Sequence, residues 1–367
     1  MSQNTAILLC NLGSPDDCSE KAVRRYLDQF LMDPSVIQLP WIIRRLIVSL
    51  LVLPKRPKAS ASAYKKIWSE DGSPLIALSR QLVKSLEKEV DNPVFLAMRY
   101  GNPSIEIQIL EIARDPAIKQ IYFIPLYPHF ADSTVATSIL EAKRVIKINQ
   151  LKIGLTVHPI FYKDPQYISA LVENCAPYIF ERASKGESLQ QDNMPHVLFS
   201  YHGLPESHLK KADPTKAHCL TATGLENKSC CQIDSIAHQT CYQHQVLETT
   251  RLFVKATGLS KEHYTISFQS RLGRAKWLEP STENTLVELA NRGVKDVVVI
   301  CPAFVTDCLE TLEEIAIQGK ATFENAGGRS LRLIPCLNDH PDWVKVVAGW
   351  CRSNSAEEHK SKDWKQD

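Results

Sequence analysis

The chain has 367 residues, too many for one ordinary hydrophobic core, so its length predicts two domains of roughly 150 residues each. With 44% apolar and 23% charged residues, it has the composition of a folded globular protein. A net charge of +2 gives no reason to expect a nucleic-acid partner. The polar start runs directly into an apolar strand without the basic stretch and cleavage site of a signal peptide, which favours a cytoplasmic protein.

Short apolar runs rich in Val and Ile alternate with helical patterns along the chain. Eight of these runs are predicted strands: residues 6–12, 94–100, 121–128, 153–160, 196–203, 264–270, 296–304 and 331–337. Apolar strands separated by helices are typical of parallel sheets covered on both faces. Four strands followed by four more predict an α/β fold of two lobes. We expect the lobes to span residues 1–165 and 166–340, with a C-terminal helix and polar tail at 341–367.

One segment, residues 36–54, is apolar enough to raise the question of a membrane span. A proline and two arginines interrupt it, and the uninterrupted run at 46–54 is far shorter than the ~20 residues that a span requires. A buried or interfacial amphipathic helix fits better. The basic residues Lys55, Arg56 and Lys58 leave peripheral contact with a membrane surface open.

Polar groups follow the ends of several predicted strands, where parallel sheets face a ligand crevice. They are Asn11, Gly13, Arg99, Tyr100, Tyr127, His202, residues 269–271 and Asp307. We expect them to converge on one cleft between the lobes. His202 stands directly after a buried strand and is a candidate functional residue, although a turn residue bonded to the backbone is the alternative. The glycine-rich phosphate-binding motifs do not occur, so no nucleotide cofactor is predicted.

A row of carboxylates follows the strand at 296–304. Asp307 is predicted to cap a helix, with Glu310 at the third position of a capping box. Glu310 and Glu314 are four residues apart, so they would share one helical face, where like charges repel. These acids could complement the helix dipole. They could instead bind a divalent cation, and an added imidazole would favour a transition metal.

The chain has eleven cysteines, which in the absence of a secretory signal are expected to be free thiols or metal ligands. Cys10 and Cys301 lie in apolar strands and are predicted to be structural. Four others lie close together in the sequence: Cys219, Cys230, Cys231 and Cys241. The adjacent pair at 230–231 favours a [2Fe–2S] cluster over Zn²⁺, with a metal-free segment as a further alternative. Three nearby histidines could substitute as ligands but are expected to be solvated: His218, His238 and His244.

Several motifs, taken together, resemble one known family. In the C-terminal half they are "FSYHGLP", "SFQSRLGRAKWLEPSTENTL" and "CPAFVTDCLETLEEIA"; in the N-terminal half they are "LLCNLGSPD", "RRYLDQFLMDPSVIQLP", "IWSEDGSPL", "AMRYGNPSI" and "IPLYPHFADSTVATS". Over residues 6–350 the chain is similar to the ferrochelatases, lyases that insert ferrous iron into a porphyrin to make haem. The resemblance implies two Rossmann-like lobes with the active site between them. The segment at 219–241 looks like an insertion relative to simpler members.

The resemblance also implies roles for particular residues. His202 corresponds to the active-site histidine and Glu310 to the carboxylate facing it across the porphyrin. With Glu314 as a proton relay they form the expected catalytic group, and His202 and Glu310 are the expected metal ligands. The expected porphyrin-binding residues are Arg56, Arg99, Tyr100, Tyr127, Ser133, Thr134 and Trp277. Residues 36–54 correspond to the hydrophobic lip through which the porphyrin enters.

The expected substrates are protoporphyrin IX and Fe²⁺, giving protohaem in the terminal step of haem biosynthesis. Coproporphyrin III is the alternative porphyrin. Other interpretations are a chelatase for cobalt or nickel and a non-catalytic two-lobed tetrapyrrole carrier. Some ferrochelatases hold a [2Fe–2S] cluster, commonly on C-terminal cysteines, which the tail of this chain does not contain. A cytoplasmic location, peripheral at the membrane if the lip contacts it, is expected, and no oligomeric state is predicted.

Overall fold

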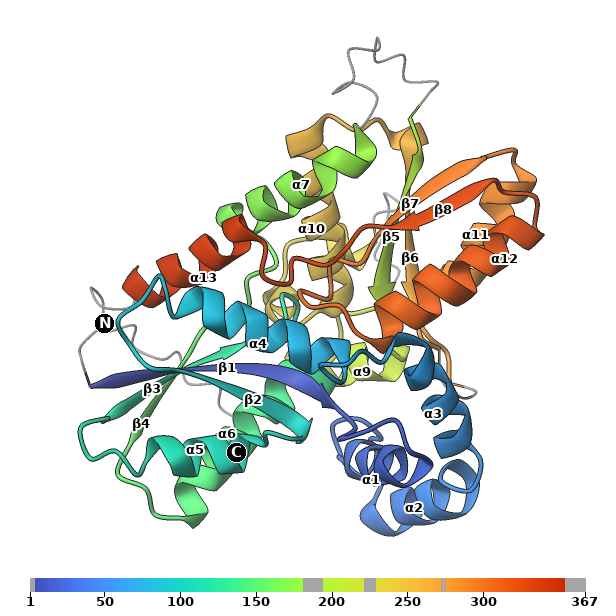
Figure 1. Ribbon diagram of the computed structural model, residues 1–367. Coiled ribbons are helices and arrows are strands. Elements are labelled where there is room, and N and C mark those ends of the chain that lie inside the picture. Colours follow the sequence, from blue (N-terminus) through green and yellow to red (C-terminus); the bar gives the residue numbers. More distant parts are fainter. Residues whose placement is uncertain (1–3, 181–193, 221–228, 272, 274, 354–367) are drawn as a thin grey trace. The chain divides into compact units, whose positions relative to one another are not determined.

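The computed structural model describes residues 4–180, 194–220, 229–271, 273 and 275–353. The chain folds into two compact units (Figure 1). The first comprises residues 1–127, 132–160 and 338–367, and the second comprises residues 128–131 and 161–337. Part of the cysteine-rich segment, residues 221–228, and the polar tail from residue 354 lie outside the described residues.

The first unit is built on a four-stranded parallel sheet in the order β2-β1-β3-β4. Its strands are β1 (Thr5–Ser14), β2 (Val94–Gly101), β3 (Gln120–Pro125) and β4 (Gly154–Val157). Its helices are α1 (Glu20–Leu31), α2 (Trp41–Leu46), η1 (Ile47–Val52), α3 (Arg56–Ile67), α4 (Pro74–Leu86), α5 (Ile105–Ile112), η2 (Asp132–Ala136), α6 (Thr137–Ile148) and α13 (Pro341–Ser353). The elements η1 and η2 are π-helices.

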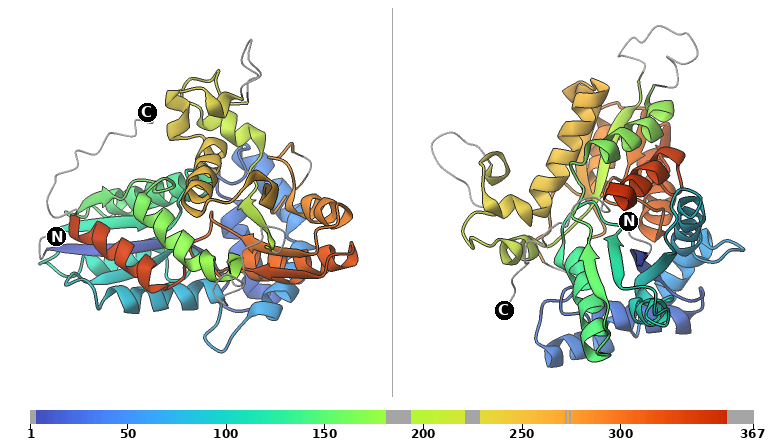
Figure 2. Two further views of the ribbon diagram at one scale, coloured as in Figure 1. Left: turned by 90° about the horizontal axis from the view of Figure 1, so that it is seen from above. Right: turned by 90° about the vertical axis from the view of Figure 1, so that its left-hand side faces the viewer.

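Helices cover both faces of this sheet, as continuous apolar strands require. Helices α5 and α6 bury Ile109 and Val145 against Leu8 and Phe123 on one face. Helix α4 packs on β1 and β2 and also against α13 (Figures 1 and 2). The C-terminal helix therefore belongs to the first unit although it follows the second in sequence.

The second unit repeats this plan, with a parallel sheet in the order β6-β5-β7-β8. Its strands are β5 (His196–His202), β6 (Tyr264–Gln269), β7 (Asp296–Ile300) and β8 (Ser330–Leu333). Its helices are α7 (Pro165–Ile179), α9 (Glu206–Ala212), η4 (Cys230–Gln232), η5 (Ile236–Gln239), α10 (Tyr242–Thr257), η6 (Lys261–His263), α11 (Thr282–Asn291), η7 (Glu310–Gly319) and α12 (Lys320–Asn325).

The core of the second unit lies on both faces of this sheet. Leu286 of α11, Ile315 of η7 and Phe323 of α12 pack on one face. On the other, the ring of Phe253 from α10 meets that of Phe199 edge-on, with ring centroids 5.3 Å apart. All eight predicted strands are confirmed, and with them the α/β fold of two four-stranded parallel sheets.

The apolar segment at 36–54 is helical only from Trp41 to Val52, as α2 followed by η1. No helix within the described ranges is both long and apolar enough to cross a membrane. Several large apolar side chains of this segment are exposed: Leu39, Trp41, Ile42, Ile43, Leu46, Leu50 and Leu51. The same segment buries Val48 and Leu53 in a cluster with Leu31 of α1, so it has one buried and one exposed apolar face.

Candidate active site

His202 is the last residue of β5, at the carboxyl edge of the second sheet. Its Nδ1 lies 2.6 Å from the carbonyl oxygen of Gly203, so in the neutral ring Nδ1 donates its hydrogen and Nε2 keeps a lone pair. Its own carbonyl accepts a 2.9 Å hydrogen bond from the Tyr242 hydroxyl. The half-buried ring lies beside Phe304, with ring centroids 6.2 Å apart. This imidazole nitrogen can accept a proton or bind a metal ion.

The turn after His202 lies very close to its neighbours. The Gly203 N–H donates to the Gln269 carbonyl at 2.7 Å, and a Cβ at residue 203 would lie 2.8 Å from that oxygen and 3.2 Å from the Trp277 ring. Only glycine permits this approach. Main-chain hydrogen bonds from Leu278 to Leu204 and from Glu206 to Lys276 fix the segment around Trp277. They place Trp277, a predicted porphyrin-binding residue, beside the turn that follows His202.

The carboxylate segment forms the π-helix η7 rather than the capped α-helix expected from the sequence. Leu309 occupies the N-cap position without a side-chain cap, so the predicted cap at Asp307 is wrong. The two carboxylate oxygens of Asp307 instead accept hydrogen bonds from the Thr311 hydroxyl at 2.8 Å and the Cys336 N–H at 3.1 Å. Burial of Asp307 explains this, because a buried carboxylate binds whichever donors the fold brings to it. π-Helical segments are frequent at functional sites.

Ser270, which directly follows β6, forms two hydrogen bonds with the carboxylate of Glu314. The Ser270 N–H donates to Oε1 at 2.7 Å and its hydroxyl donates to Oε2 at 2.5 Å. Ser270 has a φ of 67°, a left-handed conformation that costs a non-glycine residue on the order of 1–3 kcal/mol and that clusters at active sites. The two bonds to Glu314 help to hold it there. In the sequence, residue 270 is only one of several polar positions at strand ends.

The pKa of Glu314 depends on the groups around its carboxylate. Burial raises this pKa, the bonds from Ser270 lower it, the charge of Glu310 raises it further and that of His202 lowers it. The net direction is upward. The structure brings the three predicted catalytic residues together at one edge of the second sheet, because Gln269, the strand partner of His202, binds the Glu310 carbonyl and the next residue, Ser270, binds Glu314.

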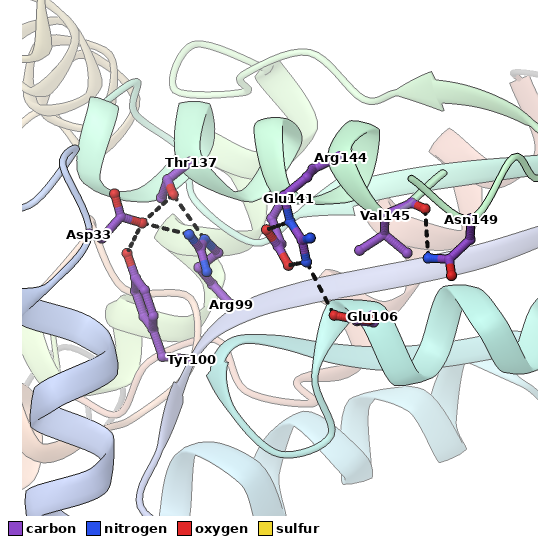
Figure 3. Close-up of polar contacts among 9 residues, drawn as sticks. All are labelled: Asp33, Arg99, Tyr100, Glu106, Thr137, Glu141, Arg144, Val145 and Asn149. Atoms are coloured by element: carbon purple, nitrogen blue, oxygen red, sulfur yellow. Dashed lines mark hydrogen bonds and ion pairs between the residues drawn. The ribbon is translucent and has the colours of Figure 1, made fainter. Parts of the chain in front are cut away.

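In the first unit, Arg99 and Tyr100 at the end of β2 bind Asp33, which the sequence analysis did not single out (Figure 3). One oxygen of Asp33 accepts hydrogen bonds from Arg99 at 2.6 Å, from the Tyr100 hydroxyl at 2.8 Å and from Thr137 at 2.6 Å. Burial alone would raise the pKa of Asp33, but the bonds from Thr137 and Ser35 and the charge of Arg99 hold it below its ordinary value. Asp33 is therefore a buried anion that fixes two predicted porphyrin-binding residues.

The other porphyrin-binding predictions in the first unit fall in two places. Tyr127 is buried shortly after β3, and burial raises its pKa. Ser133 and Thr134 are half-buried in η2, a few residues further on. Arg56 is exposed at the first position of α3. The structure thus groups Tyr127, Ser133 and Thr134 after β3, separately from Arg56.

Three of the four clustered thiols, those of Cys219, Cys231 and Cys241, pack together beside the start of α10. Cys241 accepts hydrogen bonds from the thiols of Cys219 and Cys231, which lower the pKa of Cys241 and raise the pKa of both donors. The sulfur of Cys230 accepts the Leu220 N–H at 3.3 Å. Within the described ranges, no three His, Cys, Asp or Glu side chains are arranged to hold a single metal ion.

The three histidines near these cysteines are not simply solvated, which corrects the expectation from sequence. His218 and His238 place Nε2 at 2.8 and 3.2 Å from the Cys230 carbonyl, and His244 places Nδ1 at 3.0 Å from the Cys231 carbonyl. The rings of His238 and His244 stack with centroids 3.6 Å apart. The imidazoles therefore bind the main chain of the adjacent cysteine pair.

The protein has two α/β lobes, each built on a parallel sheet. An imidazole and two carboxylates lie at the carboxyl edge of one sheet, and these groups are suited to the transfer of a metal ion and of protons. The solved structure titled "SirB from Bacillus subtilis with Fe3+" has this fold, with a TM-score of 0.51, 12% identity and 96% of each chain covered. The sequence identifies the particular family. The ferrochelatase family profile matches residues 4–355.

Individual relatives agree with that match. A ferrochelatase of Ectopseudomonas mendocina (strain ymp) is 51% identical over 348 residues, 94% of this chain and 97% of the relative. That of Pseudomonas fluorescens (strain Pf0-1) is 51% identical with the same coverage. That of Azotobacter vinelandii is 48% identical over 352 residues, 95% of this chain and 98% of the relative. The chain belongs to the ferrochelatase family, which confirms the family predicted from its motifs.

Proposed function

We propose that this protein is a ferrochelatase that inserts Fe²⁺ into protoporphyrin IX to form protohaem, the terminal step of haem biosynthesis. The observation that carries the proposal is the grouping of His202, Glu310 and Glu314 at one sheet edge through the contacts of Gln269 and Ser270, in a chain of the ferrochelatase family. A metal-inserting enzyme needs a proton acceptor and weak oxygen ligands close together, and these three side chains supply both.

The reaction exchanges two pyrrole N–H protons for one Fe²⁺ and releases two protons. His202 accepts a pyrrole proton at Nε2, the nitrogen that keeps its lone pair. Glu310 binds the hydrated ion transiently, and Glu314 carries protons away. The raised pKa of Glu314 supports this relay, because it makes Glu314 a stronger proton acceptor than an exposed glutamate. Few, weak ligands suit an ion in transit, since a closed cage would trap it.

The protein holds the porphyrin through contacts with its apolar ring and through contacts with its propionates. We assign the propionates to Arg99 and Arg56, since a guanidinium binds a carboxylate through paired hydrogen bonds. Asp33 and Thr137 already hold the Arg99 guanidinium in one orientation, so less conformational freedom is lost on binding. The remaining ring contacts are assigned to Tyr100, Tyr127, Ser133, Thr134 and Trp277.

The decisive experiment is an anaerobic insertion assay. Purified protein is mixed with Fe²⁺, or with Zn²⁺ as a surrogate, and protoporphyrin IX, and loss of the free-base visible bands is followed. Catalytic turnover supports the proposal. Turnover of coproporphyrin III alone would show that the substrate is coproporphyrin III and not protoporphyrin IX. Turnover with Co²⁺ or Ni²⁺ alone would show that the enzyme inserts a different metal. Porphyrin binding without turnover would show that the protein is a carrier.

We also propose that Cys219, Cys230, Cys231 and Cys241 hold a [2Fe–2S] cluster. The donor set fits, because three of the thiols are packed together and the fourth is adjacent in sequence to one of them. Such a cluster takes two sulfur ligands on each of two irons, so it does not require a single-ion site. When bound, it would supply a redox-active, coloured centre and tie the segment to α10.

Replacing Cys230 by serine is expected to abolish the visible absorption and the bound iron and sulfide of the purified protein and to lower its Tm, because one of four ligands is lost. Cys18→Ser is the matched control, since Cys18 is a half-buried free thiol outside the segment. A colourless wild type that contains zinc, or no metal, would contradict the cluster.

We assign to the exposed apolar face of α2 and η1 a contact with the surface of a cytoplasmic membrane. Trp41, Ile42 and Leu51 are 64%, 67% and 70% exposed, and the basic residues Lys55 and Arg56 follow them. An apolar face flanked by cations is the pattern of a helix that lies in the interface of an anionic bilayer.

The double variant Ile42→Ser, Leu51→Ser is expected to bind vesicles of anionic phospholipid at least about tenfold more weakly than wild type, because two large side chains each lose on the order of 1 kcal/mol or more of burial in the bilayer. Ile148→Ser, at a 54% exposed residue of α6, is the control and should bind as wild type does. Equal binding by all three proteins in a sedimentation assay would refute the assignment.

A further inference from the structure

We propose that Gln269 is a positioning residue that fixes the distance between the two catalytic elements, the end of β5 and the start of η7. The inference rests on the roles proposed above for His202 and Glu310. Gln269 is the last residue of β6, and its side chain is nearly fully buried. It contacts the main chain of both elements, although neither contact is predictable from its place in the sequence.

The main chain of Gln269 is bound to the end of β5. It is the partner of His202 in the parallel pairing of β5 with β6. Its carbonyl accepts the 2.7 Å hydrogen bond from Gly203, the residue to whose own carbonyl His202 donates. A shift of Gln269 would therefore move the turn on which the imidazole orientation depends.

The side chain of Gln269 is bound to the start of η7. Its Nε2 donates to the carbonyl of Glu310 at 2.8 Å. The helix begins there without a side-chain cap of its own, so this bond ties its first residue to the sheet. The next residue, Ser270, holds the carboxylate of Glu314. Gln269 thus fixes the main chain of Glu310, and Ser270 fixes the carboxylate of Glu314.

The Glu310 carbonyl fixes the direction of the Gln269 amide, and a buried hydroxyl network binds the oxygen at its other end. Oε1 accepts a 2.6 Å hydrogen bond from Ser200, whose oxygen lies 2.8 Å from Thr282 Oγ1, which in turn lies 2.9 Å from Ser267 Oγ. Reversing the amide would place Oε1 against the Glu310 carbonyl, two acceptors facing each other. The Glu310 carbonyl therefore permits one orientation only, and Ser200 supplies the donor that the amide oxygen then needs, which explains a serine two residues before the catalytic histidine on a buried strand.

A small displacement of a catalytic group can lower a rate by about 10²-fold. Gln269→Leu is therefore expected to lower kcat by roughly 10- to 100-fold while leaving KM for the porphyrin within about twofold of wild type. Ser200→Ala, a milder change, is expected to lower kcat less, because the amide keeps its bond to Glu310 but its oxygen loses the hydroxyl that donates to it. Circular dichroism and Tm establish that each variant is folded.

A double-mutant cycle separates positioning from general destabilisation. If Gln269 acts through Glu310, Gln269→Leu should lower the residual single-turnover rate of Glu310→Gln by no more than about twofold. Ser200→Ala should likewise add little to Gln269→Leu. The matched control is Tyr167→Phe, which also removes one buried bond from a side chain to a main-chain carbonyl, that of Pro302, in the same unit. It should lower Tm yet leave kcat unchanged.

The outcomes also distinguish this inference from the proposed function. A folded wild type that inserts no metal would overturn the function. An active wild type whose folded Gln269→Leu variant keeps more than half of the wild-type kcat would overturn the positioning role alone. So would full additivity between Gln269→Leu and Ser200→Ala, or a loss of kcat in Tyr167→Phe as large as that in Gln269→Leu.

Discussion

Replacing His202 by alanine is expected to lower kcat for metal insertion by about 10²–10⁴-fold, the usual contribution of a positioned general base. Alanine has no group that can take the pyrrole proton, whereas the imidazole, with its Nδ1–H bound to the Gly203 carbonyl, presents the lone pair of Nε2. The fold should be little affected, because that side-chain bond reaches only the next residue. The measurement is the initial rate of Zn²⁺ insertion with saturating protoporphyrin IX, together with Tm.

The same strand supplies the control. His196 is the first residue of β5, buried and 2.9 Å from the Thr265 hydroxyl, and burial lowers its pKa to about 4. His196→Ala should lower Tm, because it leaves a cavity and an unpaired hydroxyl, but should leave kcat unchanged. If His202→Ala keeps more than a tenth of the wild-type kcat, or if both variants lose activity equally, the general base is not His202.

The regular part of the fold was predictable because each strand carries its own signal. A short run of Val, Ile and Leu must be buried on both faces, and a parallel sheet is the structure that does this. The position of His202 after such a run was predictable for the same reason, as was the proximity of Glu310 and Glu314, which are only four residues apart. These inferences use local sequence alone.

The contacts that orient the site could not be predicted in this way. Asp307 has the sequence context of a helix cap, but its oxygens bind Thr311 and the distant Cys336, and the helix that follows is a π-helix. Gln269 and Glu310 are joined across 41 residues of sequence. Which polar side chains meet in a core is decided by the packing of several elements at once, and no local pattern records it.

Asp33 is a further contact that local sequence does not predict, and it has a large effect on stability. It follows helix α1 directly before a proline, where an acid is an ordinary turn residue. In the fold it becomes a buried anion, with its side chain 4% exposed and that of its partner Arg99 15% exposed. Four donors converge on it, three from β2 and α6 and one from Ser35.

Asp33→Asn is expected to lower the free energy of unfolding of the first unit by about 3–5 kcal/mol, because the Arg99 guanidinium is left buried without its counter-charge. For a unit of this size the loss corresponds to a fall in Tm of roughly 10 °C. The matched control is Asp28→Asn, which breaks an ion pair of the same 2.6 Å length with Arg45 on the surface. The free energy of unfolding of that variant should be lower than that of wild type by less than about 1 kcal/mol.

The dependence on pH gives a second, independent check. Because folding lowers the pKa of Asp33, the unfolded chain binds the proton more readily than the folded chain does, and the carboxylate stabilises the fold fully above the ordinary Asp value of about 3.9. This stabilisation is lost as the pH falls through the lower, folded value. The difference in unfolding free energy between wild type and Asp33→Asn should therefore stay constant at neutral pH and shrink below about pH 4. A difference that is independent of pH, or no larger than that of Asp28→Asn, would mean that Asp33 is not the buried anion on which Arg99 and Tyr100 depend.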